Sequence, residues 1–380
     1  MIKIIFWFIF ALVLFIYFGY PLVMAVLAIL FKKEHRYDDG FTPSVTMLIP
    51  AYNEESVIKE KLENTLILDY PKDKLEAIVM IDQSSDKTEE IVRSFAGKGI
   101  KMWVQVPRQG KMSALNYMLP KAQGEIIVLS DANSMYKPDA IKKLVRHFSD
   151  PKIGLVCGEL RLIDPNTLVG LGENFYWRYE KFVKIRESLM HQLLVVNGSI
   201  YSIRKELFSE VDPALADDFV LPMRIAVKGY GLIYEPEAIN EEKVSDTAQD
   251  QFNRKVRIIS QGVGASFSVM GILFKSSALR IFEFFFHKFL RWFVFLFTSI
   301  LFGLNILLLS SPLYLKIFIA QIVFYLFSLI GYILQKKGKH IKIFFVPFYF
   351  FLVNFASFCG VLGFLFGKKK ATWEKAESTR

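Results

Sequence analysis

Residues 44–55 read Ser-Val-Thr-Met-Leu-Ile-Pro-Ala-Tyr-Asn-Glu-Glu, and this stretch decides the fold. Its apolar part, Val45–Ile49, predicts a buried strand, and a helical pattern then runs from Glu54 to Leu68. The alternation continues with a strand expected over 75–81, a helix over 85–95 and a strand over 125–129. Strands that alternate with helices indicate an α/β domain with a mostly parallel sheet, covered on both faces.

Polar residues follow each predicted strand. Tyr52 and Glu54 come after the first, Asp82 and Asp86 after the second, and Asp131-Ala132-Asn133 after the third. Ligands of such sheets bind beyond the carboxyl ends of the strands, so we expect the three aspartates to meet in one crevice. Each residue alone also suits a turn, and Asp86 before Lys87-Thr88-Glu89 equally fits a helix cap.

The N-terminal segment, residues 1–33, predicts a transmembrane helix. No charged side chain lies between Lys3 and Lys32, which exceeds the roughly 20 apolar residues needed to cross a bilayer. The apolar core of a signal peptide is shorter, about 7–15 residues. Basic residues at 32, 33 and 36 follow directly, and by the positive-inside rule they place the next domain in the cytosol of a multi-pass cell-membrane protein.

The chain becomes apolar again near Phe282, and we expect about three membrane segments within 293–370. Residues 263–292 are expected to form an interfacial or amphipathic segment, although Phe284–Trp292 equally fits the first turns of the next span. Four spans that start outside also end outside, whereas Lys368–Lys370 favours an inside end. Either the last segment is a re-entrant hairpin or the rule is violated there, so the side of the C-terminus stays open.

The net charge of +10 suits nucleic acid, anionic lipid or a phosphorylated small molecule. Because the chain has apolar ends, we assign much of this charge to lipid headgroups and expect no nucleic-acid partner. Cys157 and Cys359 are far apart and predict no disulfide framework. The five histidines lack metal-ligand spacing, and the sequence contains no Gly-rich phosphate loop.

The order of motifs over residues 44–262 resembles the family-2 glycosyltransferases, the membrane group that includes cellulose, chitin and hyaluronan synthases and lipid-linked sugar transferases. The matching pieces are Pro50–Glu55, Asp82 with Asp86, Gly110-Lys111 followed by Ala114-Leu115-Asn116, Asp131-Ala132-Asn133, Asn197-Gly198, and Ala216-Asp217-Asp218-Phe219. The resemblance implies a GT-A fold over residues 40–262, which is a Rossmann-like mixed sheet that binds nucleotide-diphosphate sugars.

The resemblance also implies roles at the donor side. Ala51, Tyr52, Glu54 and Asp82 would line the nucleoside pocket, and Lys111 would reach the nucleotide or its phosphates. The alternative for Lys111 is an ordinary solvated lysine.

The Asp131-Ala132-Asn133 segment matches the metal-binding Asp-x-Asp of the family, with an amide in place of the second carboxylate. Mg²⁺ and Mn²⁺ accept both kinds of oxygen, so Asp131 is expected to be the principal ligand. Asn133 would bind the ion directly, through water, or not at all.

At the acceptor side, the resemblance makes Asp218 the general base and Asp217 a cap or a supporting residue. Asn197 and Gly198 would contact the acceptor or support the base. The alternative is that both aspartates only favour the helix start, where the dipole stabilises acids.

The synthases carry Gln-x-x-Arg-Trp further on, and this sequence departs from that pattern. Two registers are possible, 251–255 or 254–258, and Gly262 favours the second. Arg254 or Arg257 would then pair with the diphosphate, or both arginines would contact lipid phosphates. The missing tryptophan argues against processive synthesis.

The leading hypothesis is an inverting transferase that moves a sugar from a nucleotide sugar, expected to be a UDP sugar, to a lipid-linked or polysaccharide acceptor. A processive synthase with a transmembrane channel and a non-catalytic nucleotide-sugar-binding protein are the alternatives. Aromatic residues at 174–179 would line an acceptor groove or pack in the core.

Overall fold

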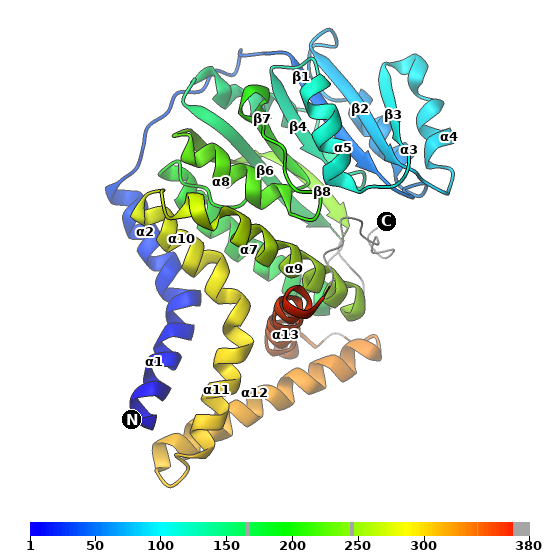
Figure 1. Ribbon diagram of the computed structural model, residues 1–380. Coiled ribbons are helices and arrows are strands. Elements are labelled where there is room, and N and C mark those ends of the chain that lie inside the picture. The colour runs from blue at the N-terminus through cyan, green and yellow to red at the C-terminus, as the bar shows by residue number, and fades with distance from the viewer. Residues whose placement is uncertain (164–167, 244–246, 340, 368–380) are drawn as a thin grey trace.

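The computed structural model describes residues 1–163, 168–243, 247–339 and 341–367. Its centre is one eight-stranded sheet with the order β3-β2-β1-β4-β7-β6-β8-β5 (Figure 1). The strands are β1 Val45–Ala51, β2 Leu75–Asp82, β3 Ile100–Gln105, β4 Ile126–Ser130, β5 Met135–Tyr136, β6 Ile153–Ile163, β7 Ile200–Arg204 and β8 Gly231–Lys243.

The sheet has a parallel half and a mixed half. Strands β3, β2, β1 and β4 are parallel, as the sequence predicts. Strand β7 is antiparallel to both β4 and β6, while β8 is parallel to β6 and antiparallel to β5. The carboxyl ends of β1, β2, β4, β6 and β8 therefore lie at one edge, which is where the polar residues gather.

Both faces of the sheet are buried, which explains the continuous apolar runs of the central strands. Along β1, Leu48 packs into one core, and Met47 and Ile49 pack into the other, because successive side chains point to opposite faces. Helices α5, α8 and α9 supply the first core, and α3, α4 and α6 supply the second. These helices are α3 Ile58–Leu66, α4 Thr88–Arg93, α5 Lys111–Met118, α6 Ala140–Val145, α8 Asp217–Val227 and α9 Ala248–Leu273.

The remaining helices lie on one side of the sheet domain, and α7 and α9 run between the sheet and the C-terminal helices (Figure 1). They are α1 Ile2–Leu14, α2 Tyr20–Leu30, α7 Leu168–Leu189, α10 Ala278–Glu283, α11 Val294–Ile306, α12 Pro312–Lys336 and α13 Phe345–Phe366. A π-helical turn, Phe15–Gly19, joins α1 to α2, and a second one, Phe284–Phe289, follows α10.

Within the described residues, five helical segments are long and apolar enough to cross a membrane: 2–30, 248–273, 278–306, 312–336 and 342–366. The segment 284–292, for which the sequence leaves two interpretations, is helical and runs directly into α11. Helix α9 has a double character, because Ala265, Val269 and Leu273 belong to the core that α9 shares with the sheet. The basic residues Lys368–Lys370 lie outside the described residues.

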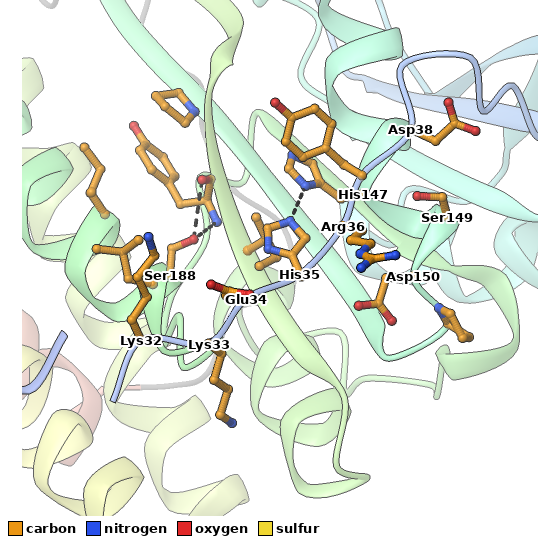
Figure 2. A pocket seen from close by; sticks show the side chains of 17 residues that line it. Lys32, Lys33, Glu34, His35, Arg36, Asp38, His147, Ser149, Asp150 and Ser188 are labelled. Atoms are coloured by element: carbon orange, nitrogen blue, oxygen red, sulfur yellow. Dashed lines mark hydrogen bonds between the residues drawn. The ribbon is translucent and has the colours of Figure 1, made fainter. Parts of the chain in front are cut away.

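The linker between α2 and β1 is held against the sheet domain (Figure 2). His35 and His147 share a hydrogen bond of 2.7 Å between ring nitrogens, and His147 bonds Glu235 at 2.6 Å. A cavity of about 1020 Å³ lies beside these contacts. Asp150, which precedes β6, lines this cavity. The cavity therefore lies near the amino end of β6, opposite the polar edge.

Candidate active site

The ends of β1 and β2 are tied together by Asn53. Its backbone N–H donates to the Ser84 hydroxyl at 3.0 Å, and its side-chain oxygen accepts from the Ser85 N–H at 2.7 Å. Asn53 has a φ of 52°, a left-handed conformation that asparagine tolerates better than most residues. The turn after Ala51 therefore brings Tyr52 to the edge where β2 ends.

Asp82 organises the loop that leads to α5. Its carboxylate is 4% exposed and accepts hydrogen bonds from the Gln105 amide at 2.6 Å and from the N–H groups of Gln109 and Gly110, each at 2.9 Å. Gly110 has a φ of 93°, so a glycine suits this close approach to the carboxylate. The loop delivers Lys111 to the polar edge as the first residue of α5.

Arg108 lies on the same loop and belongs to none of the sequence motifs named above. Its guanidinium lies 3.5 Å from the centre of the Tyr52 ring, and its Nε lies 3.7 Å from Asp82. A guanidinium over a tyrosine ring gains cation–π energy and forms a flat polar surface. No sequence signal marks Arg108, because its contact depends on how the loop after β3 folds back.

Lys111 occupies the centre of the acidic cluster. Its Nζ donates to Asp131 Oδ1 at 2.9 Å, and its side chain is only 16% exposed. Burial lowers the pKa of this lysine, but the charges of Asp131, Asp217 and Asp218 outweigh that effect and raise it above the ordinary value. Lys111 is therefore a largely buried lysine paired with a carboxylate and not an ordinary solvated one.

Asp131 and Asn133 lie on one tight turn after β4, closed by the Ser134 N–H, which donates to the Asp131 carbonyl at 3.3 Å. The Asp131 side chain is 38% exposed, so its carboxylate is accessible at the edge of the sheet. Across the described ranges, no group of three or more His, Cys, Asp or Glu side chains is arranged to hold a metal ion.

The two aspartates that begin α8 have different surroundings. Asp217 is 8% exposed, and its carboxylate accepts a hydrogen bond from the Tyr201 hydroxyl at 2.6 Å. Asp218 lies against Gly198, where a Cβ would come within 3.2 Å of Asp218 Oδ2. Burial, followed by the charge of Asp217, raises the pKa of Asp218 from 3.8 to about 6, even though Lys111 acts in the opposite direction.

Asn197 lies beneath this cluster. It is 3% exposed, accepts a hydrogen bond from the Lys184 ammonium and donates from its amide to the Gly158 carbonyl at 2.7 Å. Its backbone N–H donates to the Cys157 sulfur at 3.1 Å. These contacts make Asn197 a residue that holds the 197–199 loop, with Gly198 next to the Asp218 carboxylate.

Other residues named by the motif comparison lie in structural contacts. The Asp86 carboxylate accepts a hydrogen bond from the Thr88 N–H at 3.0 Å, next to the start of α4, whose N-cap residue is Lys87. Arg254 of α9 lies 3.6 Å from Glu173 of α7, and Arg257 follows one turn later on the same helix. Arg254 therefore lies between the two helices that separate the sheet from the C-terminal helices.

Two buried charged residues behind the site carry no motif. Lys61 of α3 is fully buried, and Glu242 of β8 is 5% exposed. Burial lowers the pKa of Lys61 to about 7, although Asp131 and Glu242 oppose this shift. A charged residue within a helix or strand pattern is usually solvated, so the sequence does not indicate that Lys61 or Glu242 is buried.

Comparison with known proteins identifies the family of this chain. The family described as Glycosyl transferase family 2 matches residues 46–212. The probable glycosyltransferase YdaM of Bacillus subtilis (strain 168) is 30% identical over 376 residues, which cover 88% of this chain and 87% of that protein. The chain belongs to glycosyltransferase family 2. This membership confirms the predicted family and favours an enzyme over a non-catalytic protein.

Two further proteins are similar to this glycosyltransferase at lower sequence identity. The poly-beta-1,6-N-acetyl-D-glucosamine synthase of Staphylococcus aureus (strain COL) is 23% identical over 258 residues, which cover 63% of this chain but only 62% of the synthase. A mannosyltransferase of Pyrobaculum calidifontis, solved in complex with GDP-Man and Mn²⁺, is 21% identical, with a TM-score of 0.72 over 96% of this chain and 99% of that one. This likeness confirms the GT-A fold of the α/β domain.

Proposed function

We propose that this glycosyltransferase moves a sugar from a nucleotide-diphosphate sugar to an acceptor at the membrane surface, with inversion at the anomeric carbon and Asp218 as the general base. The observation that carries the proposal is the cluster in which Lys111 pairs with Asp131 at 2.9 Å and interacts electrostatically with Asp217 and Asp218. Residues from β4, α5 and α8, far apart in the sequence, thus share one electrostatic site.

The nucleoside would bind beside Tyr52, Ala51 and Glu54 at the end of β1. The Arg108–Tyr52 stack offers a flat surface for a base, and Asp82 keeps the loop below it in place. Lys111 would meet the diphosphate, and Arg254 or Arg257 would approach it from α9. We propose a UDP sugar as the donor to be tested first. The S. aureus relative is named as a poly-beta-1,6-N-acetyl-D-glucosamine synthase, and a GDP sugar is the alternative because the P. calidifontis structure contains GDP-Man.

The donor set at the turn after β4 fits Mg²⁺ or Mn²⁺. Such ions are often held by one or two carboxylates, with substrate phosphates and water completing the shell, and Asp131 is accessible enough to serve. Asn133 would add an amide oxygen from the same turn. When bound, the ion would neutralise charge on the departing diphosphate.

The chemistry assigned to this chain is a single displacement. Asp218 takes the proton of the acceptor hydroxyl while the acceptor oxygen forms a bond to the anomeric carbon. The bond from that carbon to the diphosphate oxygen breaks, and the nucleoside diphosphate leaves on the opposite side, which inverts the anomeric centre. A pKa of about 6 suits a base that must be ionised at neutral pH and still accept a proton.

The acceptor would be a lipid-linked glycan or a polysaccharide, and membrane lipid would surround the helices. Support comes from the apolar helical segments outside residues 40–292, namely 2–30, 312–336, 342–366 and the end of 278–306, and from Lys32 and Lys33, which follow α2. We propose a multi-pass cell-membrane protein with residues 40–262 in the cytosol and residues 263–292 at the interface. Basic residues next to an apolar helix favour the cytosolic side.

A processive synthase is the second candidate, favoured by the similarity to the S. aureus polymer synthase. Product size distinguishes the two. A ladder of long products would support processive synthesis, whereas an acceptor extended by one sugar would support single transfer.

The test uses the full chain in detergent with Mn²⁺ or Mg²⁺ and a panel of UDP and GDP sugars. Asp218→Asn is expected to abolish transfer while nucleotide binding, measured calorimetrically, remains at the wild-type level. Asp212→Asn is the matched control, because Asp212 is an exposed acid of the preceding turn whose carboxylate accepts a local hydrogen bond from the Ala214 N–H. Transfer by Asp218→Asn at the wild-type rate would refute the assignment of the base.

A further inference from the structure

Lys61 lies directly behind the turn that carries Asp131 and Asn133. Its Nζ donates to the Ser130 hydroxyl at 2.7 Å and to the Ser134 carbonyl at 2.5 Å. Ser130 and Ser134 are the residues immediately before and after the Asp131–Asn133 segment. The ammonium group therefore binds both ends of the turn from inside the protein.

Glu242 continues the hydrogen bonds away from this turn. The Ser134 hydroxyl donates to Glu242 Oε1 at 2.7 Å, and the Asn240 amide donates to the same oxygen at 3.0 Å. The Asn240 amide also donates to the Ser199 hydroxyl at 3.0 Å. All four of these side chains are buried. The chain of bonds thus crosses from the β4 turn through β8 to the 197–199 loop.

Tyr136 provides a second connection between the same two places. Its hydroxyl donates to the Ser199 carbonyl at 2.9 Å, and the Lys61 ammonium lies 4.3 Å from the centre of its ring. Ser199 follows Gly198, whose backbone lies against the Asp218 carboxylate. Two buried routes therefore join the turn of Asp131 to the loop beside Asp218.

A buried lysine and a buried glutamate are costly to place in a protein interior. Apolar residues of similar volume often stabilise a fold as well or better, so stability alone explains such a pair poorly. Fully bonded polar groups do fix one arrangement of the chain, because any displacement leaves a buried donor or acceptor unpaired. In this network the Lys61 ammonium bonds the Ser130 hydroxyl and the Ser134 carbonyl, and Glu242 Oε1 accepts hydrogen bonds from Ser134 and Asn240. The Asn240 side-chain oxygen has no partner among the described residues, so the restraint comes from the bonds of the other groups.

We propose that Lys61 and Glu242 are positioning residues that fix the metal-binding turn of Asp131 relative to the general base Asp218. The inference rests on the proposed function in assigning the cation to Asp131. Residues that orient metal ligands from behind typically change metal affinity about 10–100-fold when removed. Loss of Lys61 is therefore expected to weaken cation binding by about that factor.

The experiment measures Mn²⁺ binding to the full chain in detergent by electron paramagnetic resonance, in the presence of saturating UDP and, separately, GDP. Lys61→Met keeps the length of the side chain and removes the ammonium group. Its Kd for Mn²⁺ is expected to rise about 10–100-fold. Leu62→Ala is the matched control, because Leu62 is the next residue of α3 and packs only into the apolar core. This control is expected to lower the thermal midpoint and to leave the Mn²⁺ affinity unchanged.

The outcomes separate positioning from mere stability. An unchanged Mn²⁺ affinity in Lys61→Met, with a lowered thermal midpoint, would overturn the inference. If Lys61→Met does not fold, Ser134→Ala and Glu242→Gln interrupt the same network more gently, and wild-type Mn²⁺ affinity in both would also overturn it. If the wild-type chain fails to bind Mn²⁺ in the presence of UDP and also in the presence of GDP, the proposed function itself is contradicted, which is a different result.

Discussion

The acid side of the pH profile offers a direct test of Asp218. Because a general base must be ionised, the rate at saturating donor falls as pH drops through its pKa, which is about 6 for Asp218. At pH 5 only about a tenth of such carboxyls are ionised, so the rate is expected to be about tenfold below its plateau. A carboxyl at the ordinary value of 3.8 would be more than about nine-tenths ionised at pH 5 and would show almost no loss.

Asp217→Asn changes this profile in a defined direction. The substitution removes the negative charge that ranks second, after burial, among the causes that raise the pKa of Asp218. The acid limb is therefore expected to move to lower pH, and the rate at pH 5 to rise relative to the plateau. The assay is initial transfer velocity from pH 4.5 to 8 at fixed ionic strength, with Asp212→Asn as the control. A wild-type profile that stays flat to pH 4.5, or an acid limb that does not move in Asp217→Asn, would refute the reasoning.

Four further outcomes are expected. Asp218→Asn should raise the free energy of unfolding at pH 8 by at most about 3 kcal/mol, because the fold disfavours the charged carboxylate. This gain should disappear below about pH 4, where Asp218 is protonated in both the folded and the unfolded chain. Thermal melts across the pH range check the sign. Chelation by EDTA should abolish transfer until Mn²⁺ is restored, and Asn133→Asp should tighten Mn²⁺ binding by adding a second carboxylate, whereas unchanged affinity would mean that position 133 does not contact the ion. Arg108→Ala should weaken nucleotide binding about fivefold, roughly the 1 kcal/mol of one lost contact between the guanidinium and the base, with little effect on the pH profile. Equal calorimetric affinities would remove Arg108 from the donor site.

The periodic features of the chain could be predicted because they are local. The strands expected over 45–49, 75–81 and 125–129 occur as β1, β2 and β4, with ends that differ by one or two residues. The helix expected over 85–95 is shorter in the structure, where α4 spans Thr88–Arg93 with Lys87 as its N-cap residue. Burial on two faces and the capping of a helix start leave patterns that neighbouring residues carry.

The polar edge could be predicted for a topological reason. Carboxyl ends of parallel strands lie at one edge, so Asp82 and Asp131 follow strands that end at the same edge of the sheet once β1, β2 and β4 are assigned. The mixed half of the sheet was not predicted strand by strand, because the pairing of β7 with both β4 and β6 follows from contacts between distant segments. The orientation of Asp82 toward the 105–110 loop likewise depends on that loop.

The sequence by itself determined the α/β domain, the apolar helices and the series of acids at strand ends, since each depends on local periodicity or on strand polarity. Only the tertiary structure decided that Lys111 lies among three aspartates, that Arg108 stacks on Tyr52, and that Lys61 supports the turn of Asp131 from inside. The physical reason is that burial and the charges of distant neighbours set what a lysine or an aspartate does, and neither quantity is written in the residues next to it.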